Sequence, residues 1–240
     1  MIITVDLGNS AIKIGYFENG VLKRKEVFDV EKAGEIEFHG PAEGAIFSSV
    51  VPEKEEMLRK KLLKLTDRVI KLSHTNARIK IQYRNPAQLG ADRISHAYFV
   101  KSFVKRAAIV VDIGTALTVD AILGDGTFLG GAIHASPQTI LDALSMKTSK
   151  LKRIKLDTWP DSFLGKSTEE CLKVGILYGV IGTVLHIVKN IEVETGRNFE
   201  KYLTGGGGKF FEEKLENFHY NPDLNLYGLL AAFEEIKMER

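Results

Sequence analysis

Two short segments of the sequence carry an aspartate, a glycine and small polar residues in the same order. The first is Asp6-Leu-Gly-Asn-Ser-Ala-Ile-Lys13, and the second is Asp112-Ile-Gly-Thr-Ala-Leu-Thr-Val119. Glycine lets the backbone approach a ligand, and successive N–H groups in such a turn form a concave anion site. The aspartate repels a bare phosphate, so it fits there only beside a bridging cation. One copy would be an ordinary hairpin turn, but two copies predict a clamp for a polyphosphate and its metal.

A third segment, Tyr-Arg-Asn-Pro-Ala-Gln-Leu-Gly-Ala-Asp-Arg over residues 83–93, combines a loop with a helix start. Pro86 cannot continue a helix, so we expect a loop there and a helix from about Leu89 to Val104. Asp92 and Arg93 then lie in the first turn, where free N–H groups and the helix dipole favour anions. Aspartate is also a routine residue at helix starts, so its position alone does not decide its role.

Composition narrows the class of protein. The chain has 240 residues, 44% hydrophobic and 27% charged, which is typical of a globular protein with room for two halves of roughly 100–120 residues. A net charge of +2 argues against a dedicated nucleic-acid binder. There is no signal-peptide pattern and no run of 18 apolar residues, so we expect a cytoplasmic protein with no membrane-spanning segment.

The single cysteine, Cys171, fits a reducing compartment, and its amphipathic helical surroundings predict a small buried side chain. Several motifs are missing from the sequence: the P-loop, a G-x-G-x-x-G after a strand, the G-x-S-x-G elbow and histidines with metal-ligand spacing. These absences argue against P-loop, dinucleotide-binding, serine-hydrolase and zinc chemistry.

Apolar runs predict the elements that place these segments. In the first half we expect strands at 1–6, 11–17, 20–28, 44–50 and 68–72, and a helix at 53–65. In the second half we expect strands at 107–112, 116–123, 127–133 and 202–204, and helices from Ser136, over 167–194, after Gly208 and over 224–237. The sequence therefore predicts an α/β protein of two similar halves, residues 1–105 and 106–240, with the last helix able to pack back on the first half.

Two glycine patterns add detail to this scheme. Gly175, Gly179 and Gly182 lie along one side of the long helix and permit close packing of a partner element, such as a second subunit. The four glycines Gly205–Gly208, between a strand and a helix, would allow a flat ligand such as adenine to contact the backbone.

Duplicated Asp-x-Gly hairpins with a late glycine-rich turn resemble the acetate and sugar kinase, Hsp70 and actin superfamily. Within it, the sequence resembles type III pantothenate kinase over essentially the whole chain. The segments that carry this resemblance are Asp6-Leu-Gly-Asn-Ser-Ala-Ile-Lys-Ile-Gly15, Tyr83-x-Asn-Pro-x-x-Leu-Gly-Ala-Asp-Arg93, Asp112-Ile-Gly-Thr-Ala-Leu-Thr-Val-Asp120, Gly130-Gly-Ala-Ile133 and Gly165-Lys-Ser-Thr168.

The resemblance implies two actin-like (ribonuclease H-like) halves with the active site in the cleft between them. It implies transfer of the γ-phosphoryl group of ATP to pantothenate, which gives 4'-phosphopantothenate in the first step of coenzyme A biosynthesis. The expected cofactors are Mg²⁺ with ATP and a monovalent cation, K⁺ or NH₄⁺. The family is typically a homodimer, and neither nucleic acid nor membrane is an expected partner.

The resemblance also implies a role for each matching residue. Asp92 would accept the proton of the attacking hydroxyl, Asp112 would hold the monovalent cation, and Asp6 would lie near Mg²⁺. The ATP-binding set is Asp6, Leu7, Gly8, Asn9, Ser10, Ala11, Ile12, Lys13 and Thr115, and the pantothenate-binding set is Tyr83, Gly90, Ala91, Asp92, Arg93 and Thr168. A guanidinium suits a carboxylate ligand, so Arg93 could take the carboxylate of pantothenate.

The sequence departs from the family pattern at Ser10, where threonine is usual, and at His134-Ala-Ser-Pro137, where a Pro-Gly pair is usual. Two alternatives stay open: a kinase of the same superfamily with another small-molecule acceptor, and a non-catalytic accessory or regulatory relative. The presence of Asp6, Asp92 and Asp112 favours the enzyme.

Overall fold

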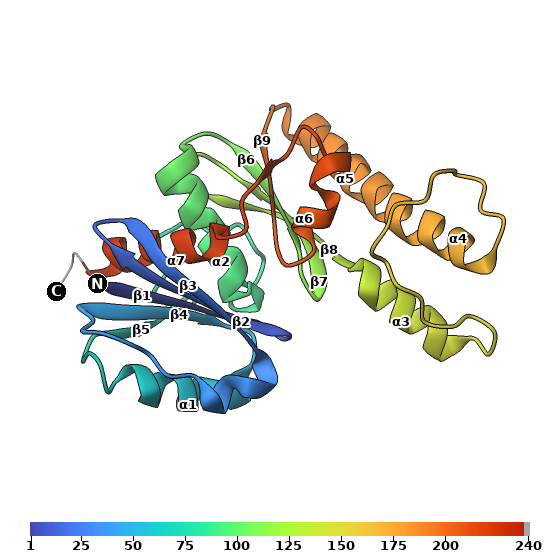
Figure 1. The fold of residues 1–240 in the computed structure, drawn as a ribbon. Helices are drawn as coiled ribbons and strands as arrows, with labels where there is room; N and C mark the ends of the chain where they lie inside the picture. Colours follow the sequence, from blue (N-terminus) through green and yellow to red (C-terminus); the bar gives the residue numbers. More distant parts are fainter. Residues whose placement is uncertain (238–240) are drawn as a thin grey trace. The chain divides into compact units, whose positions relative to one another are not determined.

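The computed structural model describes residues 1–237 and shows a mixed α/β fold with two five-stranded sheets (Figure 1). By its internal contacts the chain forms two compact units. Unit 1 comprises residues 1–107, residues 122–130 and the chain from Asp223 onward, and unit 2 comprises residues 108–121 and 131–222. The units therefore do not follow one another simply along the chain, because the segments at 122–130 and after Asp223 join unit 1.

The sheet of unit 1 has the order β3-β2-β1-β4-β5. Its strands are β1 (Ile2–Leu7), β2 (Ala11–Glu18), β3 (Val21–Asp29), β4 (Gly44–Ser49) and β5 (Val69–Lys71). The first three strands form antiparallel hairpins, whereas β4 and β5 are parallel to β1 and to each other. The Asn19-Gly20 turn has positive φ at both residues (51° and 77°), the geometry predicted for this pair between two strands.

The second sheet repeats this arrangement, with the order β10-β9-β6-β7-β8. Its strands are β6 (Ala108–Ile113), β7 (Ala116–Ile122), β8 (Phe128–Ala135), β9 (Glu200–Thr204) and β10 (His219–Tyr220). Central β6 has two consecutive strands on one side and the parallel pair β9 and β10 on the other, as β1 does in the first sheet. The predicted class of two similar halves, each with a mixed sheet, is confirmed.

The helices are named in the same way. They are α1 (Pro52–Leu62), α2 (Ala91–Phe99), α3 (Pro137–Lys147), α4 (Thr168–Lys173), α5 (Gly179–Thr195), α6 (Gly208–Phe211) and α7 (Leu224–Lys237). Short 3-10 helices cover Val30–Glu35, Pro86–Gln88 and Glu212–Lys214, and a π-helical turn, Val100–Val104, continues α2. Ser136 and Ser167 cap α3 and α4 through hydrogen bonds to backbone N–H groups, as serine at these positions predicts.

A π-helical segment, Val174–Tyr178, joins α4 and α5 into one helix of 28 residues. Among the described residues, this helix is long enough to cross a membrane, and its most apolar 18-residue stretch has a mean hydropathy of 1.9. In the structure 33% of that stretch is buried. A single helix of this kind is weak support for a span, since apolar helices of other proteins pass the same test. Cys171, which we expected to be buried, is exposed.

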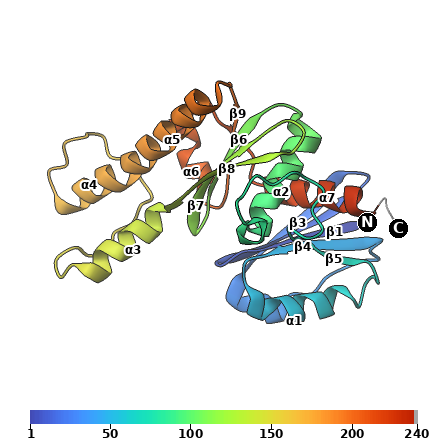
Figure 2. The same cartoon turned by 180° about the vertical axis from the view of Figure 1, so that it is seen from behind.

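Helix α7 packs within unit 1 against α2 and over β1 and β4 (Figures 1 and 2). Leu226, Leu229 and Phe233 of this helix are fully buried. Two glycines make the packing close: a Cβ at Gly44 would overlap the Phe233 ring, and one at Gly228 would overlap the carbonyl of Ser95 in α2. The helix thus joins the central strands of the sheet to α2.

Candidate active site

The turn between β1 and β2 contains the first Asp-x-Gly segment. The Gly8 N–H donates to the Ala11 carbonyl at 3.0 Å and closes the turn, which leaves Asn9 and Ser10 exposed. Leu7 and Ile12 flank the turn with fully buried side chains. Of the expected ATP-binding residues, these two can therefore offer a ligand only their backbone groups, whereas Asn9 and Ser10 present polar side chains.

Asp6, at the end of β1, accepts hydrogen bonds on both carboxylate oxygens. The Ser48 hydroxyl donates to Oδ1 at 2.9 Å, and the Asn225 amide donates to Oδ2 at 3.0 Å. These two hydrogen bonds fix the orientation of the carboxylate. Ser48 is the direct neighbour of Asp6 in the parallel pairing of β1 with β4, and Asn225 comes from α7. The sequence analysis found neither partner.

The surroundings of Asp6 fit a divalent cation bound together with phosphate. Asn225 Oδ1 is buried and has no hydrogen-bond partner, which leaves a free oxygen acceptor beside the carboxylate. Among residues 1–237 no three His, Cys, Asp or Glu side chains gather to form a metal cage. Mg²⁺ is usually held by one or two carboxylates, water and phosphate oxygens rather than by such a cage. Asp6 suits that mode of binding.

Asp92 lies in the first turn of α2, as predicted, and is partly exposed. Its Oδ1 accepts a hydrogen bond from the Arg93 N–H at 2.9 Å, and its carbonyl accepts one from the Ser95 hydroxyl at 2.5 Å. A Cβ at Gly90 would overlap Asp92 Oδ1, so the glycine of the Gly-Ala-Asp-Arg segment allows the carboxylate this orientation. Gly90 and Ala91 therefore shape the site without a reactive side chain.

Arg93 is only 4% exposed and forms a stack with two aromatic rings. Its Nη1 donates to the Tyr83 hydroxyl at 2.8 Å, and its guanidinium lies 5.7 Å from the Tyr83 ring centre and 5.3 Å from the Phe128 ring centre. Distances of this size suit cation–π contacts. The buried guanidinium thus holds the Tyr83 hydroxyl and its ring in place.

Phe128, the first residue of β8, also holds the segment that carries Tyr83. Its N–H donates to the Lys80 carbonyl at 2.8 Å, and its carbonyl accepts from the Gln82 N–H at 2.9 Å. Its ring is fully buried, with its centre 5.7 Å from that of Tyr83. No motif in the sequence marked Phe128, because it meets Tyr83 and Arg93 only through the fold.

In unit 2, the Asp112 turn is built against the glycine-rich turn. Gly114 N–H donates to the Ala116 carbonyl at 2.9 Å, which closes the turn and leaves Thr115 exposed. Gly205 has φ +89°, and a Cβ there would overlap Asp112 Oδ1. Gly207 N–H donates to the Ile113 carbonyl at 2.9 Å. Two segments far apart in sequence thus make one structure around the Asp112 carboxylate.

A cavity of about 250 Å³ lies in unit 2 beside this structure. Its volume is below the range of roughly 300–1,000 Å³ typical of pockets for drug-sized ligands. It is lined by Ile113, Gly114, Ser136, Pro137, Gln138, Leu156, Leu177, Gly207, Phe210 and Phe211. The Phe210 ring also stacks on Trp159, with centres 4.9 Å apart and planes 7° from parallel.

Thr168, an expected substrate contact, lies exposed at the start of α4.

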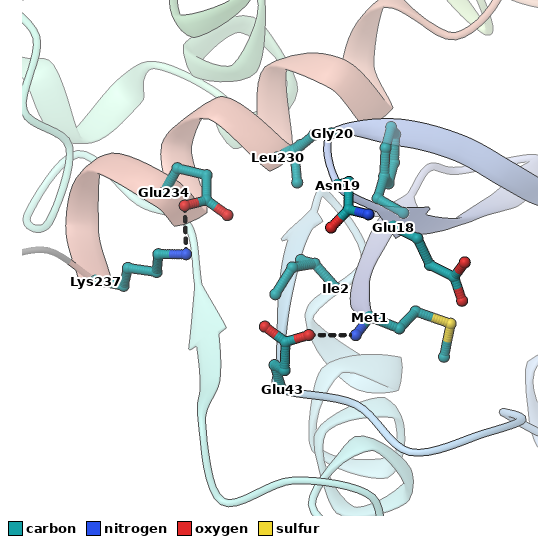
Figure 3. A pocket seen from close by; sticks show the side chains of 10 residues that line it. Met1, Ile2, Glu18, Asn19, Gly20, Glu43, Leu230, Glu234 and Lys237 are labelled. Carbon is teal, nitrogen blue, oxygen red and sulfur yellow. Dashed lines mark hydrogen bonds and ion pairs between the residues drawn. The ribbon is translucent and has the colours of Figure 1, made fainter.

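Another cavity, of about 420 Å³, lies in unit 1 at the start of β1 (Figure 3). Its charged groups are largely paired within the cavity: the Met1 amine contacts Glu43 at 2.6 Å, and Lys237 contacts Glu234. The hydrogen bond from the amine lowers the pKa of Glu43. The cavity contains none of the expected site residues, and Asp6 lies near the other end of β1.

Comparison with known proteins decides the family. The sequence profile described as type III pantothenate kinase matches residues 2–190. The chain belongs to this family. A type III pantothenate kinase from Parafrankia sp. is 30% identical over 249 residues, which cover 98% of both chains. Like its family, the chain is an ATP-dependent kinase that phosphorylates pantothenate in coenzyme A biosynthesis, with a nucleotide and a divalent metal such as Mg²⁺.

Solved structures support the fold of this type III pantothenate kinase. A Baf family transcriptional activator from Campylobacter jejuni matches with a TM-score of 0.69 and 21% identity, over 97% of this chain and 98% of that one. MreB 5 of Spiroplasma citri bound to AMPPNP matches with a TM-score of 0.50 and 9% identity, over 98% of this chain and 96% of that one. At these identities the likeness concerns the fold alone.

Proposed function

We propose that Asp92 is the proton acceptor of the kinase reaction. The primary hydroxyl oxygen of pantothenate forms a bond to the γ-phosphorus of ATP while the bond from that phosphorus to the β–γ bridging oxygen breaks. ADP leaves with the bonding electrons, and the hydroxyl proton passes to the Asp92 carboxylate. The observation that carries this proposal is the partly exposed carboxylate in the first turn of α2, held in place by the Arg93 N–H and given room by Gly90.

Asp6 and the Gly8–Ser10 turn are proposed to hold the phosphates of ATP and their Mg²⁺. The exposed turn offers polar side chains and backbone N–H groups, and Lys13 is partly exposed on the following strand. Mg²⁺, when bound, offsets the negative charge of the phosphate oxygens. The two donors fix the Asp6 carboxylate in place, so that it can hold the cation.

Tyr83 is proposed as the side chain that contacts pantothenate, with Arg93 behind it. The Tyr83 hydroxyl already accepts a hydrogen bond from Arg93, so its own proton is free to be donated to a substrate oxygen. Thr168 and the Gly90–Arg93 segment complete the proposed pantothenate contacts.

Asp112 is proposed to bind the monovalent cation, K⁺ or NH₄⁺, and Thr115 to contact phosphate. The close approach of the Gly205 backbone limits the space around the Asp112 carboxylate, and the apolar cavity beside Gly207 suits adenine. This assignment agrees with the expected position of adenine at the Gly205–Gly208 turn.

The enzyme is also proposed to be a cytoplasmic homodimer. Large apolar side chains are exposed on and before the long helix, including Phe163 (69%), Leu164 (72%), Leu185 (48%) and Val193 (71%). A second subunit over this helix would remove them from water. Light scattering should give twice the mass of one chain, and Leu185→Glu should shift the protein toward the monomer. A wild-type monomer at micromolar concentration would refute this part.

The decisive assay is ADP release with ATP, Mg²⁺ and pantothenate, first in K⁺ and then with Na⁺ replacing K⁺. Turnover that depends on pantothenate and on K⁺ is the expected result. Equal rates in Na⁺ and K⁺ would refute only the proposed binding of a monovalent cation by Asp112, and not the kinase reaction. ADP release without pantothenate dependence would indicate a hydrolase or another acceptor, and no turnover in any cation would favour the accessory relative.

A further inference from the structure

Asn225, at the start of α7, contacts the carboxylate of Asp6 across 219 residues of sequence. Its side chain is 4% exposed, and its amide donates to Asp6 Oδ2 at 3.0 Å. The orientation of the amide follows from chemistry, because an ionised carboxylate only accepts hydrogen bonds and must therefore face the NH₂ group. The amide oxygen therefore takes no part in this hydrogen bond.

That oxygen, Asn225 Oδ1, is buried and has no hydrogen-bond partner among the described residues. A buried acceptor without a donor is unfavourable, so its retention calls for an explanation. Water bound to a divalent cation at Asp6 would supply the missing donor, since such water is a strong hydrogen-bond donor. Ser48 donates its hydroxyl proton to the other carboxylate oxygen.

The same face of α7 also contacts the helix that carries Asp92. Gly228 follows Asn225 by three residues, so both lie on one side of the helix. A Cβ at Gly228 would lie 2.7 Å from the carbonyl carbon of Ser95, and the Ser95 hydroxyl donates to the Asp92 carbonyl at 2.5 Å. One face of α7 therefore contacts both Asp6 and the Ser95 backbone, close to Asp92.

We propose that Asn225 is a positioning residue for metal binding: its NH₂ group fixes the Asp6 carboxylate, and its oxygen accepts a hydrogen bond from water on the divalent cation. Through Asn225 and Gly228, α7 sets Asp6 and Asp92 in one rigid frame. This inference rests on the proposed role of Asp6 as the carboxylate near Mg²⁺.

The test measures Mn²⁺ binding to the protein–ADP complex by the EPR signal of free Mn²⁺, so that it does not depend on turnover. Asn225→Ala should raise the Mn²⁺ dissociation constant about 10-fold, in the range found for residues that orient metal ligands. Ser48→Ala should have a smaller effect, because Asn225 still holds the Asp6 carboxylate and still offers its amide oxygen. Asn225→Asp keeps the shape but sets two carboxylates together, so its Mg²⁺-dependent activity should follow a pH profile different from that of the wild type.

Leu226→Ala is the matched control, since this neighbouring α7 residue is fully buried and has no polar group. It should lower the melting temperature at least as much as Asn225→Ala and leave Mn²⁺ binding within about twofold of the wild type. Equal effects of the two variants on Mn²⁺ binding would show that Asn225 only anchors the helix. Asp6→Asn tests the role of Asp6 independently of Asn225. If this variant binds Mn²⁺ like the wild type, the assignment of Asp6 to the metal site is wrong.

Discussion

The backbone of Gly205 lies directly against the carboxylate of Asp112, with φ +89° and no space for a Cβ. A non-glycine residue there would be strained in its backbone and would displace the carboxylate as well. Asp112 is the proposed ligand of the monovalent cation, so this close packing couples the glycine-rich turn to cation binding within unit 2.

Gly205→Ala should therefore weaken activation by K⁺. The added Cβ would overlap Asp112 Oδ1 and lie 2.5 Å from the Ile113 carbonyl oxygen, so the turn must shift. We expect the K⁺ concentration for half-maximal activity to rise severalfold and the unfolding free energy to fall by about 1–3 kcal/mol. Gly206→Ala is the control, because a Cβ at Gly206 meets no atom within 4 Å. Unchanged K⁺ activation in Gly205→Ala would count against the role of Asp112.

Asp92→Asn should remove most of the turnover. An amide cannot accept the hydroxyl proton, and loss of general-base catalysis typically costs about 10²–10⁴ in rate. Affinity for ATP, measured by calorimetry, should stay close to that of the wild type. Wild-type kcat in this variant would disprove the assignment of Asp92.

Phe128→Leu should raise the KM for pantothenate. The change keeps an apolar side chain but removes the ring that packs on Tyr83 and Arg93. Because Tyr83 then loses part of its support, we expect KM for pantothenate to rise about 5–20-fold while KM for ATP stays constant, which corresponds to about 1–2 kcal/mol.

Phe47→Leu provides the control for Phe128, since Phe47 is equally buried in the core of unit 1 and lies in β4. It should destabilise the protein without changing KM for pantothenate. Equal KM values in the two variants would mean that the Phe128 ring contributes stability only.

Alkaline pH should destabilise the protein through Tyr98. Burial raises the pKa of its hydroxyl to about 12, and the Arg78 N–H donates to that hydroxyl at 2.7 Å. Because the folded pKa exceeds the unfolded value of about 10, this contribution is complete below pH 10 and is lost as pH rises toward 12. Two pKa units correspond to about 2.7 kcal/mol.

Denaturant titrations at pH 8, 10 and 11 measure this effect. Tyr98→Phe should be less stable at pH 8, because the Arg78 N–H loses its acceptor, but its stability should fall less steeply above pH 10. Burial also raises the pKa of Tyr16, so some slope should persist in the variant. An unchanged slope would mean that Tyr98 does not titrate in this range.

Trp159, the single tryptophan, should report nucleotide binding by its fluorescence. Its ring stacks on Phe210, which also lines the proposed adenine cavity. A base that enters the cavity will change the surroundings of this stack, so ADP titration should alter the emission. Trp159→Phe should abolish the signal and leave turnover nearly constant. A wild-type signal that is insensitive to saturating ADP would place adenine elsewhere.

The sequence was informative where chemistry and local structure coincide. Asp6, Asp92 and Asp112 stand at strand ends or helix starts that apolar periodicity predicts within a few residues, and the paired hairpins predicted the two similar sheets. Ser48, Asn225 and Phe128 were missed because they meet these segments only through long-range packing. All three lie in strands or a helix that the sequence predicts, but nothing in the sequence marks their contacts with the site. The prediction for Cys171 was wrong because amphipathic spacing does not fix which helix face meets the core.

The place of α7 has a consequence for how the protein matures. β1 is synthesised before α7, and the amide that holds Asp6 follows 219 residues later. Contacts of such long sequence separation form slowly. During synthesis Asp6 therefore gains its Asn225 partner last. If Asp6 holds the divalent cation as proposed, nascent chains that lack α7 should already form the β1–β2 hairpin but bind the metal poorly.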